Sequence, residues 1–305
     1  MTSSTAAEYG NEPREVGPAG SVPDQVAADA ARLAVTGQRV SLALPRFRQM
    51  PLFKGHPQFE VLSFRTPPGL KQNQDRPWGP INNVGLGYMS ELVQCSAHSG
   101  AHVDALAHMT IGPEGRWYGG GNVTDHLGDF GPTVGDGSQL PAFFTRGVLL
   151  DAAGWLGVDC LDKGHALSAD DLQAIARHQR VEVRPWDVVL VRTGYLSLWP
   201  DEERMARHLT AGPDISAARW LSSVGVIGAG SDTETFEVQP APDVESTGNP
   251  QPVHSHLLIE QGIYLFESLY LEKLATHHQY EFLFVALPTK IRGTTGSMLD
   301  PLAVF

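Results

Sequence analysis

Short runs of apolar residues constrain the fold of this chain more than any other feature of its sequence. The stretches RGVLLD (146–151), WDVVLVR (186–192) and EFLFVALP (281–288) are rich in Val, Leu and Phe and are bounded by turn residues. Because apolar residues follow one another without polar alternation, these runs are typical of strands buried inside a sheet. The sequence therefore predicts a sheet at the centre of the molecule.

Helical segments lie between these strands. The stretch 168–179 begins with Ser168 and carries Asp171 at its third helical position, which resembles a capping box. A second capped helix is expected at 214–225, followed by a strand at 224–230. Further expected elements are a helix at 23–37, a strand at 38–45, a strand entering 87–104, a helix at 253–262 and a strand at 263–271. Strands and helices alternate only in part, which favours an α/β layered domain with a mixed sheet.

The chain of 305 residues has no internal repeat and no sharp break in composition. We therefore expect a single domain over residues 22–305. Residues 1–21 mix Ser, Gly, Pro and Glu with little apolar content, which predicts a flexible N-terminal arm. The segment from Arg46 to Asn83 is dense in Pro, Gly and aromatic residues, and long excursions of this kind are often functional.

Composition excludes several classes of partner. The formal net charge is −12 and no basic run is present, so a nucleic-acid partner is not expected. No apolar stretch approaches the roughly 18 to 20 residues that span a bilayer, and the polar N-terminus lacks an apolar signal core. We expect a cytoplasmic protein without a membrane partner, and the two cysteines, Cys95 and Cys160, are expected to be reduced structural thiols.

The stretch HSGAHVDALAHM (98–109) gathers His98, His102, Asp104 and His108. On one helix, at about 100° per residue, the first pair and the last pair would point more than about 120° apart. On a straight strand, His98 and Asp104 would be ~20 Å apart at about 3.3 Å per residue. The four groups can meet only if the chain curls, and Gly100 permits such a turn.

Imidazole and carboxylate groups together are ligands for zinc, manganese or iron. A structural zinc site would normally include cysteines, whereas three N/O ligands with room for water describe a catalytic site. The alternatives are exposed loop histidines or a hydrogen-bond network around Asp104. We favour an open metal site that lines a pocket.

A second group of candidate ligands lies at 253–269, where His254, His256, Glu260 and Glu267 occur. A helix from His254 to 261 would rise roughly 10 Å. Gly262 would then allow a reversal, and a strand to Glu267 would return a similar distance. His254 and Glu267 are therefore predicted to end at one level and to bind metal, whereas His256 and Glu260 are expected to face solvent.

Other residues carry weaker signals. Asp232 follows an expected strand and either lines the pocket or caps a turn, and the second role is favoured. Neither a GxSxG elbow nor a nucleotide-binding glycine motif is present. Four aromatic residues could flank an aromatic substrate or serve in packing, namely Phe53, Trp78, Trp117 and Tyr118.

The stretch from His98 to His108 resembles the HxGTHxDxPxH motif of the cyclase-like metal-dependent hydrolases, a family that includes kynurenine formamidase and isatin hydrolase. The stretches RGVLLD, VVLVRTGY, VHSHLLIEQGIYLFESL and FLFVALPTKIRGTTGSMLDPLAV are also similar to that family. The likeness extends from roughly residue 36 to the end. Ala101 and Leu106 replace the usual threonine and proline, which argues against kynurenine formamidase itself.

The resemblance implies a swivelling β/β/α fold, assembled as a homodimer or homotetramer. It also implies that His98, His102 and Asp104 bind a catalytic divalent metal, zinc or manganese, with one or two ions per subunit. His254 and Glu267 match the positions that complete the site. His108 matches the histidine assigned to proton transfer.

These observations support a metal-dependent hydrolase that cleaves a carbon–nitrogen amide bond of a small molecule, such as a linear or cyclic amide, a formamide or an isatin-like ring. Water activated by the metal would be the nucleophile, and Glu267 is a second candidate for the proton role if it does not bind metal. An ester or lactone hydrolase with the same site is an alternative. A metal-binding protein without turnover is another.

Overall fold

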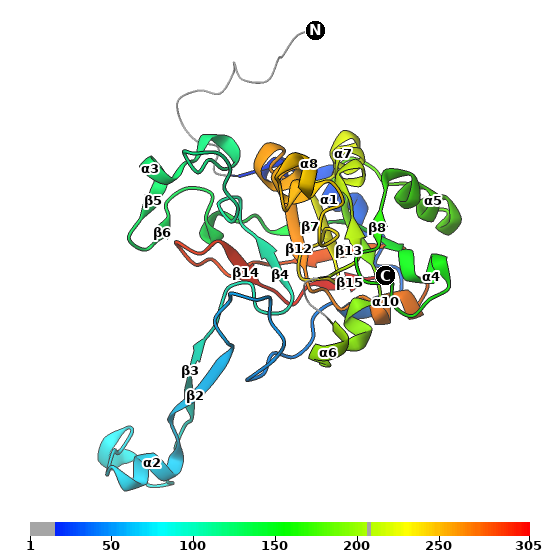
Figure 1. Cartoon of the computed structure of the whole chain (residues 1–305). Helices are drawn as coiled ribbons and strands as arrows, with labels where there is room; N and C mark the ends of the chain where they lie inside the picture. The colour runs from blue at the N-terminus through cyan, green and yellow to red at the C-terminus, as the bar shows by residue number, and fades with distance from the viewer. Residues whose placement is uncertain (1–15, 206–208) are drawn as a thin grey trace.

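A nine-stranded mixed sheet forms the centre of the molecule (Figure 1). The computed structural model describes residues 16–205 and 209–305. In spatial order the strands are β1 (Arg39–Ser41), β15 (Leu302–Val304), β13 (Glu281–Ala286), β7 (Phe143–Asp151), β9 (Val188–Arg192), β11 (Gly228–Ser231), β12 (Tyr264–Glu267), β4 (His102–Asp104) and β14 (Gly296–Met298).

Four central strands, β7, β9, β11 and β12, are parallel to their neighbours within that group. The strands on either side pair antiparallel: β13, β15 and β1 on one edge, and β4 and β14 on the other. The expected single α/β domain with a mixed sheet is thus confirmed.

Both faces of the central strands are buried, as the apolar runs predict. Val148 and Val189 belong to one core, together with side chains of α5 (Ala169–Gln179) and α7 (Ile215–Val224). Leu149 and Val188 belong to a second core on the opposite face. The α1 helix (Asp24–Ala31) lies against β7 and β13. Successive residues of a strand point to opposite faces, so continuous apolar runs supply both cores.

The remaining elements are shorter. The other α-helices are α2 (Pro67–Gln72), α3 (Val123–His126), α4 (Ala152–Leu156), α6 (Glu202–Met205), α8 (Val244–Thr247), α9 (Pro252–His254) and α10 (Glu272–Thr276). Short 3-10 turns occupy Pro18–Ser21, Gly79–Ile81, Tyr118–Gly120, Gly137–Gln139 and Tyr195–Leu198, and a π-helical segment covers Ser255–Glu260. Three separate two-stranded sheets pair β2 (Glu60–Arg65) with β3 (Ser90–Gln94), β5 (Leu127–Gly128) with β6 (Gly131–Pro132), and β8 (Ala166–Leu167) with β10 (Gly212–Pro213).

Local sequence signals predict most of these elements, but several bounds differ. The strand expected at 38–45 covers only Arg39–Ser41, and the helix expected at 253–262 is divided into α9 and the π-helical segment. The capping box at the start of α5 is present, because Ser168 Oγ accepts from the Asp171 amide and Asp171 accepts from the Ser168 amide. The helix expected at 23–37 ends earlier, at Ala31. The single strand expected within 87–104 is divided into β3 and β4.

The expected N-terminal arm, residues 1–21, falls mostly outside the described residues. Its last part forms the 3-10 turn Pro18–Ser21, and Ala19 is buried in the core. The Gly17 amide donates to the Tyr264 hydroxyl at 3.3 Å. Over residues 16–205 and 209–305, no helix combines the length and the apolar character needed to cross a membrane.

Candidate metal centre

A tight turn between β3 and β4 brings the first candidate ligands together. Gly100 has a φ of 65°, a left-handed conformation that glycine adopts without strain. Arg46 holds the outside of this turn, since its guanidinium donates to Ser99 O at 2.7 Å and to Ala101 O at 2.5 Å. The curl expected from Gly100 is therefore present.

The curled segment places three histidine side chains around Asp104, which is fully buried. His98 Nδ1 lies 2.9 Å from Asp104 Oδ1, and His102 Nε2 lies 3.5 Å from the same oxygen. The rings of His98 and His108 are 4.1 Å apart between centroids. Candidate ligand atoms of His98, Asp104 and His108 lie within 4.8 Å of one another.

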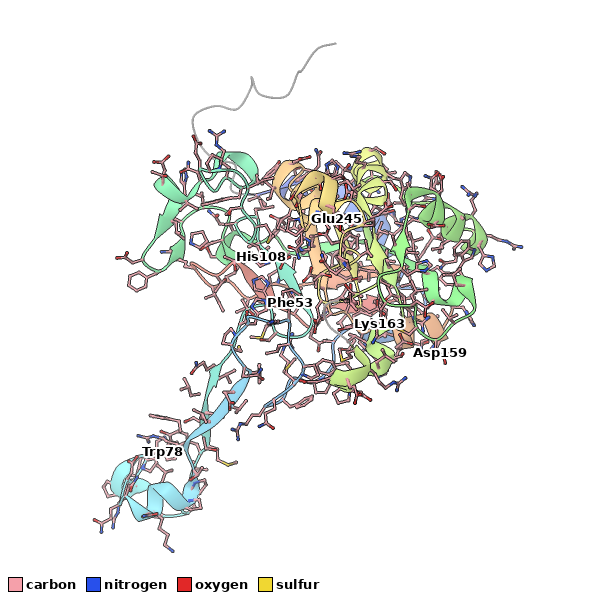
Figure 2. All side chains as sticks on the ribbon, in the orientation of Figure 1. Phe53, Trp78, His108, Asp159, Lys163 and Glu245 are labelled. Carbon is pink, nitrogen blue, oxygen red and sulfur yellow. The ribbon has the colours of Figure 1, made fainter. Side chains whose placement is uncertain are left out.

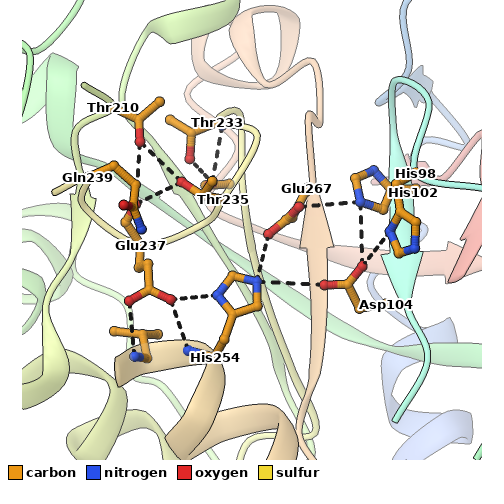
Figure 3. Close-up of polar contacts among 12 residues, drawn as sticks. His98, His102, Asp104, Thr210, Thr233, Thr235, Glu237, Gln239, His254 and Glu267 are labelled. Carbon is orange, nitrogen blue, oxygen red and sulfur yellow. Dashed lines mark hydrogen bonds and ion pairs between the residues drawn. The ribbon is translucent and has the colours of Figure 1, made fainter. Parts of the chain in front are cut away.

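His254 and Glu267 reach the same point from the C-terminal half of the chain (Figure 3). His254 ends α9, and Glu267 ends β12, opposite His102 of β4 in the antiparallel register. His254 Nε2 lies 3.2 Å from Glu267 Oε1, and His102 Nε2 lies 3.3 Å from Glu267 Oε2. Gly262, with a φ of 66°, makes the reversal between them. The two groups of candidate ligands therefore form one cluster.

The tautomers of two histidines follow from their contacts. His102 Nδ1 lies 2.7 Å from Gly100 O, and a carbonyl oxygen accepts, so this nitrogen carries a proton. His254 Nδ1 lies 2.5 Å from Glu237 Oε1 and donates in the same way. When these two rings are neutral, Nε2 presents a lone pair toward the carboxylates of Asp104 and Glu267.

Such a set of acceptor atoms fits a cation. Among the described residues, the buried atoms without a hydrogen-bond partner include His102 Nε2, both carboxylate oxygens of Asp104 and Glu267 Oε1. Buried acceptors that face one another repel unless a positive charge lies between them. Imidazole nitrogen and carboxylate oxygen are the donor types that bind zinc and manganese.

A proton can take the place of that positive charge. Burial lowers the pKa of His102, but Asp104 and Glu267 outweigh burial and raise this pKa to about 10. Cation binding at this cluster would therefore displace a proton from His102.

His108 differs from the other histidines of the cluster. Burial lowers its pKa to about 4, and the nearby Asp104 only partly offsets this effect. The ring is thus neutral at pH 7 and can accept a proton. It lines a cavity of about 240 Å³ together with His98, His102, His254 and Glu267.

Three residues of this region were missed by the sequence reasoning. Glu237 supports His254: its carboxylate accepts from the His254 ring, from the His254 amide at 3.0 Å and from the Val253 amide at 3.1 Å. His56 lines the cavity and stacks on His98 at 5.4 Å. The third is Arg46 at the turn. Glu237 follows β11 in the same stretch as Asp232, so its place after a parallel strand was an available signal.

The cavity has an apolar wall formed by residues from several loops, among them Leu52, Phe53, Met109, Leu196 and Trp199. Of the aromatic residues considered from the sequence, Phe53 lines this cavity. Trp78 lies on a distant hairpin, apart from His108 in Figure 2, and is 52% exposed. Trp117 is buried and Tyr118 packs on the core. These three residues do not line the cavity, so they contribute to packing or to another surface of the molecule.

The other candidate residues lie outside the cluster. His256 pairs with Glu260 at 2.8 Å and with Ser222, and the Glu260 side chain is 58% exposed. Asp232 accepts from the amides of Thr193 and Gly194, at 2.9 and 2.7 Å, so it caps the turn after β9, the favoured expectation. Cys95 and Cys160 are free thiols and half-buried.

Comparisons with known proteins agree with this architecture. The Cyclase family model matches residues 40–238. None of the curated proteins matches the sequence. A solved structure described as a novel cyclase superposes with a TM-score of 0.82 at 25% identity, covering 96% of this chain and 94% of the other.

Two further structures share the fold at lower identity. Isatin hydrolase A from Labrenzia aggregata, bound to benzyl benzoate, is 20% identical with a TM-score of 0.63, over 92% of this chain and 97% of its own. A structure described as a predicted metal-dependent hydrolase from Bacillus stearothermophilus is 18% identical with a TM-score of 0.53, over 87% and 97%.

Proposed function

The chain belongs to the Cyclase family, and from this premise we propose that it is a metal-dependent hydrolase that cleaves a carbon–nitrogen amide bond in a small molecule. One observation carries the proposal: buried polar atoms of His102, Asp104 and Glu267 that have no hydrogen-bond partner among the described residues converge on one point beside a cavity. A cluster of this kind at the base of a cavity is suited to binding and activating a reactant.

We propose that His98, His102, Asp104, His254 and Glu267 hold one or two divalent ions, zinc or manganese. A bound ion would supply an acidified water and a polarised substrate carbonyl. Two overlapping sets of candidate ligands share Asp104: His98 and His108 complete one, and His102 and Glu267 complete the other. This overlap supports a count of one or two ions per subunit.

In this proposal, His108 transfers the proton. Its ring is neutral at pH 7, because burial lowers its pKa to about 4. It lines the cavity beside the cluster, so it can accept a proton from the attacking water and pass it to the leaving nitrogen. Glu267 faces the two imidazole Nε2 atoms, which supports a ligand role for it rather than a proton role.

The proposed substrate is a small amide, linear or cyclic. A cavity of about 240 Å³ suits a small molecule, and Leu52, Phe53 and Trp199 give it an apolar wall. Isatin hydrolase A shares the fold at 20% identity, so a ring amide is the first substrate class to test. An ester or lactone would pass through a similar tetrahedral species, and it forms the second arm of the test.

The test is metal analysis of the purified protein, followed by rate assays with isatin, an N-formyl aromatic amine, a cyclic imide and a lactone. We expect zinc or manganese at one or two equivalents and amide hydrolysis that stops with a chelator and returns with the metal. A hydrolysis rate that does not change when the chelator is added would contradict the proposal. Bound metal with no turnover on any substrate would favour a metal-binding protein, and turnover of the lactone alone would favour the ester class.

A further inference from the structure

One loop, residues 51–56, supplies a continuous part of the wall of the cavity beside the metal centre. A turn closes this loop, because the His56 amide donates to Phe53 O at 3.2 Å. Gly55 has a φ of 106°, a conformation that residues with a side chain rarely adopt. Phe53 lies close to His108 in Figure 2, and both line the cavity. The turn 53–56 therefore presents neighbouring side chains to the proposed reaction site.

His56 has a defined orientation within this turn. Its Nδ1 lies 3.2 Å from Ser96 Oγ, and its ring stacks on the ring of His98 at 5.4 Å between centroids and 14° between planes. Ser96 Oγ also accepts from the His98 amide at 3.2 Å. The Ser96 hydroxyl hydrogen therefore points to His56 Nδ1, which is the acceptor that the described residues offer it. The proton of the neutral ring is then on Nε2, so His56 gives the cavity wall a hydrogen-bond donor.

Lys54 gives the same turn a positive charge. It is exposed, and among the residues that line the cavity it is the only lysine or arginine. Within residues 16–205 and 209–305, no carboxylate forms an ion pair with its ammonium group. An ammonium group has three donors and no acceptor. The described part of the chain therefore offers a cation at the cavity without supplying an anion to pair with it.

The acidic groups of the cavity lie on other elements. Glu267 belongs to the proposed metal centre with Asp104, and Glu234 is in the loop that follows β11. A divalent ion in the proposed centre would balance the charges of Asp104 and Glu267. The turn 53–56 is then the part of the wall where a negatively charged group on a ligand gains most from charged hydrogen bonds.

The apolar part of the wall indicates the rest of the ligand. Leu52 and Phe53 come from the same loop as Lys54, and Trp199 also lines the cavity. Small-molecule sites combine a mainly apolar lining with a few polar groups that fix the orientation of the ligand. An aromatic ring suits this lining, since flat apolar rings pack well against aliphatic and aromatic side chains.

We propose that the turn 53–56 is an anion subsite that selects aromatic amides bearing a carboxylate group. Lys54 pairs with the carboxylate and His56 Nε2 donates to it, while the aromatic ring lies against Leu52 and Phe53. The substrate is thereby oriented with its amide toward the metal centre. For the reaction this inference rests on the proposed hydrolase function, whereas binding of the anion does not require turnover.

The test compares the three formamidobenzoate isomers with nitroformanilides of the same substitution, because a nitro group has the shape of a carboxylate without its charge. For the preferred isomer, Lys54→Met should lower kcat/KM for the carboxylate, relative to the nitro compound, by about 10- to 100-fold, as expected for a lost hydrogen bond between charged groups. Most of this loss should be in KM, because the contact is made before the reaction begins. The ratio cancels the different reactivities of the two compounds.

Three further variants sharpen this comparison. Lys54→Arg keeps the charge and should restore the ratio to within about threefold of the wild type. His56→Phe keeps a ring that can stack on His98 but lacks the donor, so the ratio should fall by about fivefold. Lys71→Met is the matched control, since Lys71 is on α2 and does not line this cavity, and it should leave the ratio unchanged.

Calorimetry with the aminobenzoates gives a second readout that needs no turnover, with the neutral aminobenzamides as references. We expect the aminobenzoate to bind more tightly, and Lys54→Met to remove about tenfold or more of the difference. Equal binding of charged and neutral rings, or a carboxylate preference that survives Lys54→Met, would overturn the proposal. If no amide is hydrolysed but the preference still depends on Lys54, the hydrolase function fails and the anion subsite stands.

Discussion

The candidate metal centre and the hairpin of residues 60–94, here called the hairpin extension, depart from ordinary burial in opposite ways. At the cluster, ionisable side chains such as Asp104 and Glu267 are buried and face other acceptors. On the hairpin extension, apolar side chains such as Phe64 and Met89 are exposed by 76% and 75%. Folded chains normally pair buried charges and cover contiguous apolar surface. The two regions therefore break the usual pattern in different ways, one by burying ionisable groups and the other by exposing apolar ones.

The comparison implies that the two regions act separately. The cluster is built from β4, β12 and α9, whereas the hairpin extension contacts solvent along both strands. A change at one region should leave the property of the other region intact. The following predictions test this separation, in order of expected effect.

The largest effect is expected from His102→Ala and Asp104→Ala. Each removes a proposed ligand at the centre of the cluster, so bound metal and hydrolysis should both fall by more than about a hundredfold, beyond the cost of losing a supporting hydrogen bond. Elemental analysis and rate assays would measure this, and light scattering should still report the wild-type mass. Full metal content in Asp104→Ala would contradict the ligand assignment.

His108→Asn should separate proton transfer from metal binding. The amide keeps a similar size but cannot accept the proton, so turnover should fall by about 10²- to 10⁴-fold. The metal content should stay at the wild-type level, because the other five side chains of the cluster remain. Loss of metal in this variant would instead make His108 a ligand.

Glu237→Gln should have an intermediate effect on metal affinity. Its carboxylate orients His254, and loss of such a support typically costs 10- to 100-fold in affinity. A competition assay against a chromogenic chelator would measure the change. Glu260→Gln is the matched control, since Glu260 pairs with His256 at the surface and should leave affinity unchanged. Equal losses in both variants would contradict a specific role for Glu237.

The smallest effect is expected when a residue of the hairpin extension is replaced and metal binding and turnover are measured. Phe64→Glu should change metal content and turnover per subunit by less than about twofold. Its effect on subunit stability should stay within about 0.5 kcal/mol, as for most exposed substitutions. Thermal unfolding and rate assays under dilute conditions would check both. A large loss of bound metal would show that the two regions are coupled.

Local signals predicted much of the fold and most of the proposed site. Apolar runs identified β7, β9 and β13, because burial on both faces removes polar alternation. The geometry of the 98–108 segment required a turn at Gly100, which has a positive φ. The helix-and-return argument placed His254 beside Glu267, and their side chains are 3.2 Å apart.

The rest depends on contacts between distant segments. Arg46, His56 and Glu237 reach the site from loops, where no periodicity indicates the direction of a side chain. The pairing of Leu62 with Leu92 joins strands 30 residues apart along the chain. The intervening excursion lacks a regular pattern, so the sequence did not indicate that it leaves the body.

The position of the cluster in the chain also sets when it can form during synthesis. Glu267 follows Asp104 by 163 residues, which a ribosome adds in roughly 8 to 30 s at about 5 to 20 residues per second. During that interval the first three ligands have left the ribosome or are leaving it, while His254 and Glu267 do not yet exist. Binding of the proposed metal by the complete ligand set would therefore wait until Glu267, about seven-eighths of the way along the 305 residues, has emerged, which makes metal loading a late event in biosynthesis.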